Sequence, residues 1–211
     1  MIDLFIDTSI KYITISVIES DDIIYTFHEK IMEDLSVKIL SIIDNALKKT
    51  NKNVSDINKI YVVNGPGSFT GIRIGLTIVK VLAWSLNISV IPVSSLELIA
   101  TTDVNKDYIV PCIDARRENG YLGLYDKDLN IIKNDQFCNV NDFLKKNCLK
   151  DNYALVTYDD INVENRVFPN INIMKIVKKH KNDKSVNPHL LNPNYLKNTE
   201  AEEKLKHDKK N

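Results

Sequence analysis

The sequence predicts an α/β protein in which mixed sheets are flanked by helices, and its 211 residues fit one compact domain or two small lobes. Three observations support this class. Three segments rich in β-branched and aromatic residues open the chain, helical and strand patterns then alternate, and the second half partly repeats that order. A strand reached through a helical crossover pairs in parallel, whereas strands joined by tight turns pair antiparallel, so the sheet is expected to be mixed.

The first half has a regular order of predicted elements. Apolar positions at helical spacing define its long helices, two lysines favour the end of the first of these, and a serine caps the last helix. In order, the elements are strands at 2–7, 12–19 and 22–28, a helix at 34–50, a strand at 59–64, a helix at 69–86, a strand at 89–93 and a helix at 94–100.

The second half begins after a polar stretch at 104–108, which is a plausible junction between lobes. Its predicted elements are strands at 108–116, 120–126 and 131–137, a helix at 140–149 and a strand at 153–158. We therefore expect an N-terminal lobe at 1–103, a C-terminal lobe at 104–196 and a frayed polar tail at 197–211.

Composition argues against several classes of protein. The formal net charge is zero, so a basic balance that would favour direct nucleic-acid binding is absent. The three cysteines, Cys112, Cys138 and Cys148, have no paired spacing, which fits a reducing compartment. The N-terminus lacks the basic region of a signal peptide, and no apolar run is expected to span a bilayer. These features predict a cytoplasmic protein without a membrane segment.

The segment "YVVNGPGSFTGIRIGL", residues 61–76, joins a strand to a helix through a glycine-rich loop. A Walker A loop requires lysine and a hydroxyl after its last glycine, and Ile72 and Arg73 stand there instead. A dinucleotide loop requires GxGxxG, but the third glycine comes one residue late. The loop is therefore expected to be a structural turn, with a serine or threonine cap and weak anion attraction as its only phosphate-like feature. Its residues are Gly65, Pro66, Gly67, Ser68 and Gly71.

The helices at 34–50 and 69–86 carry more apolar surface than one sheet should require. Gly71 and Gly75, four residues apart, would leave a groove where another helix could approach closely. Two hypotheses stay open: the helices bury each other within one domain, or they form an apolar ridge for a partner protein. The residues expected at such an interface are Leu35, Ile39, Ile42, Ile43, Ala46, Phe69, Ile72, Gly75, Leu76, Ile78, Val79 and Leu82.

Four segments together resemble the TsaB family, also called YeaZ. They are "FIDTS" at 5–9, "GPGSFTGIRIGL" at 65–76, "DARRENGYLGLYD" at 114–126 and "NPNYL" at 192–196, in the order found in that family. The glycine motif is highly specific, and the others support it. The chain departs from the family at Leu35, where a histidine is frequent, at Glu118-Asn119, and at Lys197 in place of a terminal arginine. These departures weaken the transfer of single-residue roles.

The resemblance implies a two-lobed fold similar to actin, Hsp70 and the sugar kinases (the ASKHA fold). It also implies a non-catalytic subunit in the formation of threonylcarbamoyladenosine, next to the anticodon of tRNAs that read codons beginning with A. The implied partners are a TsaD-like transferase, bound through the two N-terminal-lobe helices, and a TsaE-like ATPase. The tRNA would be contacted indirectly, the isolated chain could form a homodimer, and ATP or ADP is expected only at the assembled interface.

Two enzymatic alternatives stay open. An actin-like kinase or phosphatase would use the first turn, Asp7, Thr8 and Ser9, to hold magnesium and phosphate, but that turn lacks glycine. Asp7 is more simply expected to order the turn. A metallopeptidase would need clustered ligands, and the four histidines are scattered. In the hairpin turn of Asp114, Arg116 and Arg117, the arginines are expected to be solvated.

Overall fold

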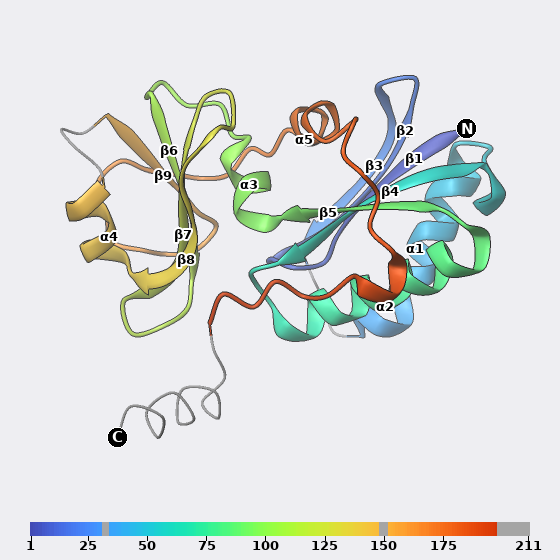
Figure 1. Ribbon diagram of the computed structural model, residues 1–211, viewed down its shortest axis with the longest axis horizontal. Helices are drawn as coiled ribbons and strands as arrows, with labels where there is room; N and C mark the ends of the chain where they lie inside the picture. Colours follow the sequence, from blue (N-terminus) through green and yellow to red (C-terminus); the bar gives the residue numbers. More distant parts are fainter. Residues whose placement is uncertain (31–33, 148–151, 198–211) are drawn as a thin grey trace.

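The computed structural model describes residues 1–30, 34–147 and 152–197. Within them the chain forms two five-stranded mixed sheets with helices between and outside them (Figure 1). This confirms the predicted fold class. Cys148 and the predicted tail beyond Lys197 lie outside the described residues.

The first sheet has the strand order β3-β2-β1-β4-β5. The first three strands pair antiparallel, as a meander, while the last two add in parallel on the other side of β1. Helices α1 (Leu35–Lys49) and α2 (Phe69–Leu86) provide the crossovers that parallel pairing requires. The strands are β1 (Ile2–Asp7), β2 (Tyr12–Glu19), β3 (Asp22–Lys30), β4 (Ile57–Gly65) and β5 (Ser89–Ser94).

The second sheet repeats this topology, with the order β10-β9-β6-β7-β8. Its three consecutive strands β6, β7 and β8 are again antiparallel, and β9 and β10 are again parallel additions. Helix α4 (Val140–Asn147) follows β8 as α1 follows β3. The strands are β6 (Tyr108–Asp114), β7 (Asn119–Asp126), β8 (Ile131–Asn139), β9 (Tyr153–Val156) and β10 (Arg166–Val167).

Alternating residues of β1 face two different hydrophobic clusters. Leu4 and Ile6 pack with α1 and α2, whereas Phe5 packs with α3 (Ser95–Ala100) and α5 (Ile173–Lys179). The second sheet lies against α3 and α5 with one face and against α4 with the other. The layers therefore run from α1 and α2, through the first sheet, to α3 and α5, the second sheet and α4. Because both faces of the sheets are covered, the central strands are continuously apolar.

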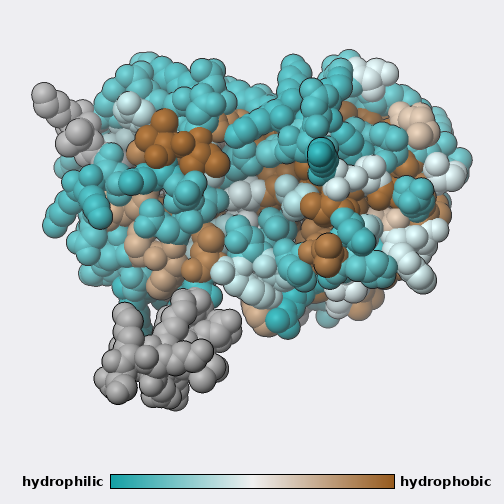
Figure 2. All heavy atoms as spheres, in the orientation of Figure 1, coloured by the Kyte–Doolittle hydropathy of each residue, from teal (hydrophilic) through white to brown (hydrophobic). Residues whose placement is uncertain are grey.

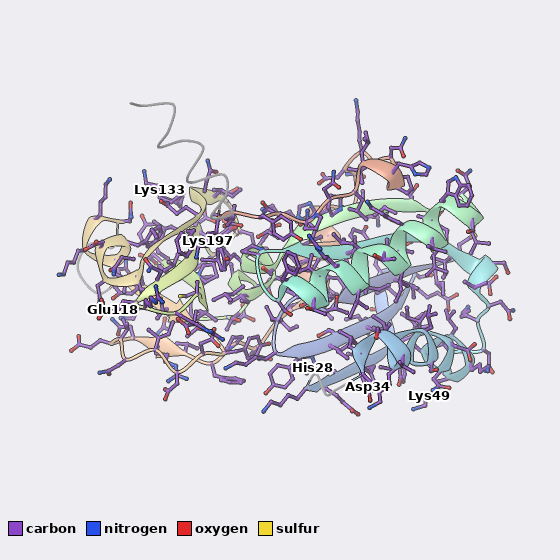
Figure 3. All side chains as sticks on the ribbon, turned by 90° about the horizontal axis from the view of Figure 1, so that it is seen from below. His28, Asp34, Lys49, Glu118, Lys133 and Lys197 are labelled. Atoms are coloured by element: carbon purple, nitrogen blue, oxygen red, sulfur yellow. The ribbon has the colours of Figure 1, made fainter. Side chains whose placement is uncertain are left out.

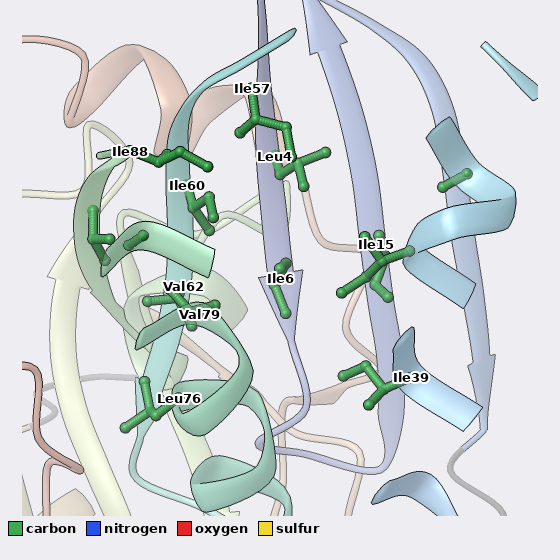
Figure 4. Packing of buried hydrophobic residues seen from close by; sticks show 14 of the residues in the cluster. Leu4, Ile6, Ile15, Ile39, Ile57, Ile60, Val62, Leu76, Val79 and Ile88 are labelled. Carbon is green, nitrogen blue, oxygen red and sulfur yellow. The ribbon is translucent and has the colours of Figure 1, made fainter. Parts of the chain in front are cut away.

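Helices α1 and α2 lie side by side on the outer face of the first sheet, where Asp34 and Lys49 mark the ends of α1 (Figure 3). Apolar residues surface on the face shown in Figure 2 as separate patches among hydrophilic ones. Figure 4 shows Ile39 of α1 and Leu76 and Val79 of α2 pointing into the core that the strands build. Each such buried side chain contributes roughly 1.5–3 kcal/mol, so the inner faces of both helices are used by the subunit itself.

The expectation that no apolar run is long enough to span a bilayer is wrong, because α2 has the length and the apolar composition of a membrane-spanning helix. In the fold, α2 packs its inner face on the first sheet and carries Arg73 and Lys80 within its length. The core helix of a folded domain meets the same criteria, so the absence of a membrane segment stays a prediction.

The end of the chain returns to the first lobe. Residues 186–197, which we call the strap, run along β5 and α2: Val186 N donates to Val90 O at 2.9 Å, and Asn194 N donates to Asn64 O at 2.8 Å. Leu191 is buried in the cluster formed by α1, α2 and the first sheet. The boundary between the two lobes, placed between residues 103 and 104, stays a prediction. The last residues of the expected C-terminal lobe, 104–196, contact the first lobe. Neither the strap nor α5 was anticipated.

A buried carboxylate ties α5 to α3. Glu97 lies 2.9 Å from Nε2 of His180 and 2.6 Å from Nζ of Lys179. Burial opposes ionisation of Glu97, but the hydrogen bonds from His180 and Lys179 leave its pKa below the ordinary value. The hydrogen bond to Glu97 raises the pKa of His180 against the effect of desolvation. The pair therefore stabilises the contact between α3 and α5 when both groups are charged.

We expect His180→Ala to lower the free energy of unfolding by about 1–2 kcal/mol at pH 6, and by less at pH 8.5. Because the pKa of His180 is raised in the folded state, its contribution to stability is complete at pH values below its ordinary pKa of 6.5. That contribution is lost as the pH rises through the pKa of the folded state. The lowered pKa of Glu97 makes its own contribution complete above 4.5. Urea unfolding at both pH values measures the difference. His189→Ala, which removes an exposed histidine, is the control, and equal losses at both pH values in His180→Ala would contradict the assignment.

Candidate functional site: the glycine loop and two helices

The turn after β1 is organised by Asp7. Its Oδ1 accepts hydrogen bonds from the amide and the hydroxyl of Ser9, both at 2.7 Å. Complete burial raises the pKa of Asp7 to about 6, although the hydrogen bonds from Ser9 lower it. A carboxyl with such a pKa would suit a general base. Asp7 is 0% exposed, however, so a substrate in solution cannot reach it.

This turn lies directly on the first turns of α2. Ser68 N donates to the Ser9 carbonyl at 2.6 Å, and Thr8 Oγ1 donates to the Gly71 carbonyl at 2.7 Å. A Cβ atom added at Gly71 would overlap the Thr8 carbonyl oxygen, and one added at Gly67 would overlap the Ser9 carbonyl oxygen. Glycine is therefore required at both positions because two backbones approach within van der Waals contact.

The predicted groove at Gly71 and Gly75 is not available to a partner helix. The side chain of Thr8 fills it, and a Cβ atom at Gly75 would overlap Thr8 Oγ1. The expectation that Gly75 belongs to a partner interface is therefore wrong. The small residues of α2 receive the first turn of the same chain, which fixes how α2 leaves the loop.

The glycine loop makes several hydrogen bonds within its own chain. The side chain of Ser68 caps α2 by accepting from Gly71 N at 3.2 Å. The Pro66 carbonyl, after a cis Gly65–Pro66 bond, accepts from the Ser95 hydroxyl. A phosphate cradle needs converging free amides. Here the amide of Ser68 donates to the Ser9 carbonyl and the amide of Gly71 donates to the Ser68 hydroxyl, so neither is free.

A cleft of about 310 Å³ separates the two lobes beside the loop. Ser9, Gly67 and Ser68 line one wall, and Asp114 and Tyr121 line the other. The carboxylate of Asp159 holds the cleft together, since it accepts from Asp114 N at 2.8 Å and pairs with Lys11 at 2.9 Å. The structure thus brings the first turn, the glycine loop and Asp114 to one cleft.

The two arginines of the hairpin turn lie apart from that cleft. Arg116 and Arg117 are exposed and adopt positive φ angles of 67° and 53°. Arg116 N donates to Asp114 Oδ1 at 3.0 Å, which closes the turn. The hairpin is ordered by Asp114, and the guanidinium groups extend into solvent.

Most of the residues expected at a partner interface lie in the core of the subunit. The buried residues of each helix lie on the face that is turned toward the sheet. The apolar pattern of the sequence alone does not distinguish this face from the outer one. Ile42, Ile78 and Leu82 are half-buried. The eight buried residues, for which the interface expectation is wrong, are Leu35, Ile39, Ile43, Ala46, Ile72, Gly75, Leu76 and Val79.

The outer face of α1 and α2 nevertheless carries apolar side chains. Val37 and Leu40 of α1 are 74% and 55% exposed, and Val81 of α2 is 57% exposed. Ile74 and Ile78 lie half-buried against the same core. We call these five residues and Leu82 the outer helical face. A second apolar stripe on each helix, beside the one that faces the sheet, is the sequence signal that would have identified Val37, Leu40, Ile74 and Val81.

Phe69 lies on a different side of α2. Its ring stacks on Tyr195 of the strap with centroids 5.6 Å apart, and the Arg73 guanidinium lies 3.7 Å from its centroid. Phe69 is 55% exposed, but it faces the strap and not α1. We therefore separate it from the outer helical face.

Comparison with known proteins gives consistent matches. Residues 29–187 match the family model described as tRNA N6-adenosine threonylcarbamoyltransferase, TsaD. The tRNA threonylcarbamoyladenosine biosynthesis protein TsaB of Bacillus subtilis is 30% identical over 95% of this chain and 96% of its own length. The corresponding protein of Buchnera aphidicola from Schizaphis graminum is 30% identical over 72% of this chain and 76% of its own. The structure of YeaZ from Pseudomonas aeruginosa shares the fold, with a TM-score of 0.75 at 19% identity, covering 92% of this chain and 99% of that one.

We expect Gly71→Ala to lower the free energy of unfolding by about 1–3 kcal/mol, because its Cβ must displace the Thr8 carbonyl. Helix propensity alone predicts the opposite, a gain of about 1 kcal/mol. Thr70→Ala, at the neighbouring exposed position, is the matched control and should change stability by less than about 0.5 kcal/mol. Urea unfolding followed by circular dichroism measures the free energy of unfolding and distinguishes the two expectations. A Gly71→Ala variant as stable as the parent would refute the close approach of the two backbones.

Proposed function

The chain belongs to the TsaB family, and from this we propose that it supports a TsaD-like transferase as a subunit in tRNA threonylcarbamoyladenosine biosynthesis. The match to a curated TsaB protein over 95% of the chain carries this proposal. The target is the adenosine next to the anticodon of tRNAs that read codons beginning with A. The comparisons do not favour a kinase, phosphatase or metallopeptidase.

The outer helical face is the proposed contact with the transferase. Contiguous apolar surface on a soluble protein usually marks an interaction site. Val37, Leu40 and Val81 are each more than half exposed. Their burial in a complex would remove apolar area from water at roughly 25 cal/mol per Å².

Common ancestry of the two subunits supports the same geometry. The chain matches a family model named for the transferase over residues 29–187, so a TsaD-like partner is expected to present the equivalent pair of helices. Equivalent patches on two similar folds pair most simply about a two-fold axis. The same argument allows the isolated chain to form a homodimer through its outer helical face.

We propose that this subunit is not itself catalytic. The enclosed carboxyl of Asp7 and the occupied amides of the glycine loop support that assignment. ATP or ADP would then be contacted only where the assembled subunits meet, with a TsaE-like ATPase as the further partner. The complex would act in the cytoplasm, where its tRNA substrate is found.

We expect Leu40→Glu or Val81→Glu to weaken pairing with the TsaD-like protein of the same cell by at least about tenfold, because an unpaired carboxylate would be buried at the interface. Both side chains are more than half exposed, so the isolated variants should fold normally. Calorimetric titration gives the dissociation constant, and unfolding curves verify the fold.

Ile132→Glu on β8, a residue 49% exposed in the second lobe, is the matched control and should pair normally. Ile72→Glu is unsuitable, because Ile72 is 1% exposed and its replacement would unfold the subunit. Normal pairing by both Leu40→Glu and Val81→Glu would show that the transferase does not dock on the outer helical face.

A further inference from the structure

Helix α2 and the strap form a second surface, on the side of α2 that faces away from α1. Arg73 Nε donates to the Tyr195 hydroxyl at 2.9 Å, and a groove of about 580 Å³ runs between the helix and the strap. We call Phe69, Arg73, Lys80 and Trp84 of α2, with His189 and Tyr195 of the strap, the α2–strap band. None of these residues belongs to the outer helical face.

The band has an unusual charge distribution. The whole chain is balanced, with 28 basic and 28 acidic residues, yet residues 57–96 contain no Asp or Glu, and neither does the strap. Arg73 and Lys80 both line the groove. Neither has a carboxylate within ion-pair distance among the residues that the structure describes, whereas Lys11, Lys175 and Lys181 do. Two cations are therefore left without counter-ions in a surface free of acidic groups.

The same band exposes aromatic rings. Trp84 is 69% exposed, Phe69 55% and Tyr195 47%. The rings of Phe69 and Tyr195 are stacked at an interplanar angle of 23°, and the rings of Trp84 and His189 meet edge to face with their centroids 6.2 Å apart. Exposed aromatic rings with adjacent cations are the components of surfaces that bind single-stranded nucleic acid.

The dimensions suit a short strand. Phe69 and Trp84 lie 15 residues apart on α2, about 22 Å along the axis at 1.5 Å per residue. That length corresponds to roughly six stacked nucleotides at about 3.4 Å each. The strap continues to the second lobe, where Lys197 Nζ lies 5.1 Å from the ring centroid of Phe137 (Figure 3).

We propose that the α2–strap band binds a single-stranded segment of the tRNA directly, with Arg73 and Lys80 on phosphates and Phe69, Tyr195 and Trp84 stacking against bases. This proposal rests on the proposed function, and it replaces the indirect tRNA contact that the family resemblance implies. An acidic peptide would use the cations but would not need three exposed rings. An anionic membrane would use the rings but would not need a groove between α2 and the strap.

The test uses the purified complex of this chain with its TsaD-like transferase, and a transcript of a tRNA that reads codons beginning with A. Filter binding is measured over a range of salt concentrations. Arg73→Gln with Lys80→Gln should weaken binding by about tenfold and reduce the slope of log affinity against log salt by about two. Trp84→Ala should weaken binding several-fold without changing that slope, because it removes stacking and no charge.

Lys145→Gln, an exposed lysine on α4, is the matched control and should leave both quantities unchanged. Size-exclusion chromatography of the parent chain and of each variant with the transferase separates the two proposals. If the unmutated parent chain does not co-elute with the transferase, the proposed function is refuted. Normal pairing with unchanged tRNA affinity in both band variants would overturn this inference alone. If the band variants keep the tRNA affinity of the parent but no longer bind vesicles containing phosphatidylserine, as the parent does, the band is a membrane-binding surface. That result would also overturn the tRNA inference.

Discussion

The close approach of the turn at Thr8 and Ser9 to the first turns of α2 is the constraint on which the rest of the structure depends. Two backbones meet there with glycines at the contact, and hydrogen bonds from Thr8 and Ser68 close it. Because the turn ends β1 and α2 follows β4, this contact fixes the helix relative to two strands of the sheet. It also occupies the amides of Ser68 and Gly71, so a loop resembling a nucleotide site has a structural role in this subunit.

With its start fixed, α2 presents three sides to three environments. Val79 and Leu76 enter the core, Ile78 is half-buried against it while Val81 is exposed, and Arg73 and Trp84 face the strap. The first side stabilises the subunit, the second is the proposed contact with the transferase, and the third is the proposed RNA surface. This division explains why apolar residues cover most of the circumference of α2. A helix with a single buried face would not need so wide an apolar surface.

Regular elements were predictable where the pattern was long and periodic. The bounds of α2 at Phe69 and Leu86 follow from a serine cap at one end and from Asn87, which adopts the left-handed conformation, at the other. Helix α5 was missed because it has only seven residues in a polar region. The strap has little regular structure, and its position depends on hydrogen bonds to Val90 and Asn64, far away in the sequence.

The surplus of apolar residues on α1 and α2 was visible in the sequence, but not which residues would be exposed. Ile39 is 0% exposed and its neighbour Leu40 is 55% exposed, because adjacent positions of a helix lie about 100° apart around its axis. The direction of the sheet decides between them, and only tertiary structure supplies it. Likewise Gly75 suggested a groove for a foreign helix, whereas Thr8 of the same chain occupies that space.

Hydrogen–deuterium exchange, compared between the chain alone and the chain mixed with its TsaD-like transferase, tests the central claim most directly. The account predicts slower exchange in peptides covering α1 and α2, and unchanged exchange in the hairpin of β6 and β7 that lines the cleft. Slower exchange confined to that hairpin and the cleft, with α1 and α2 unaffected, would contradict it.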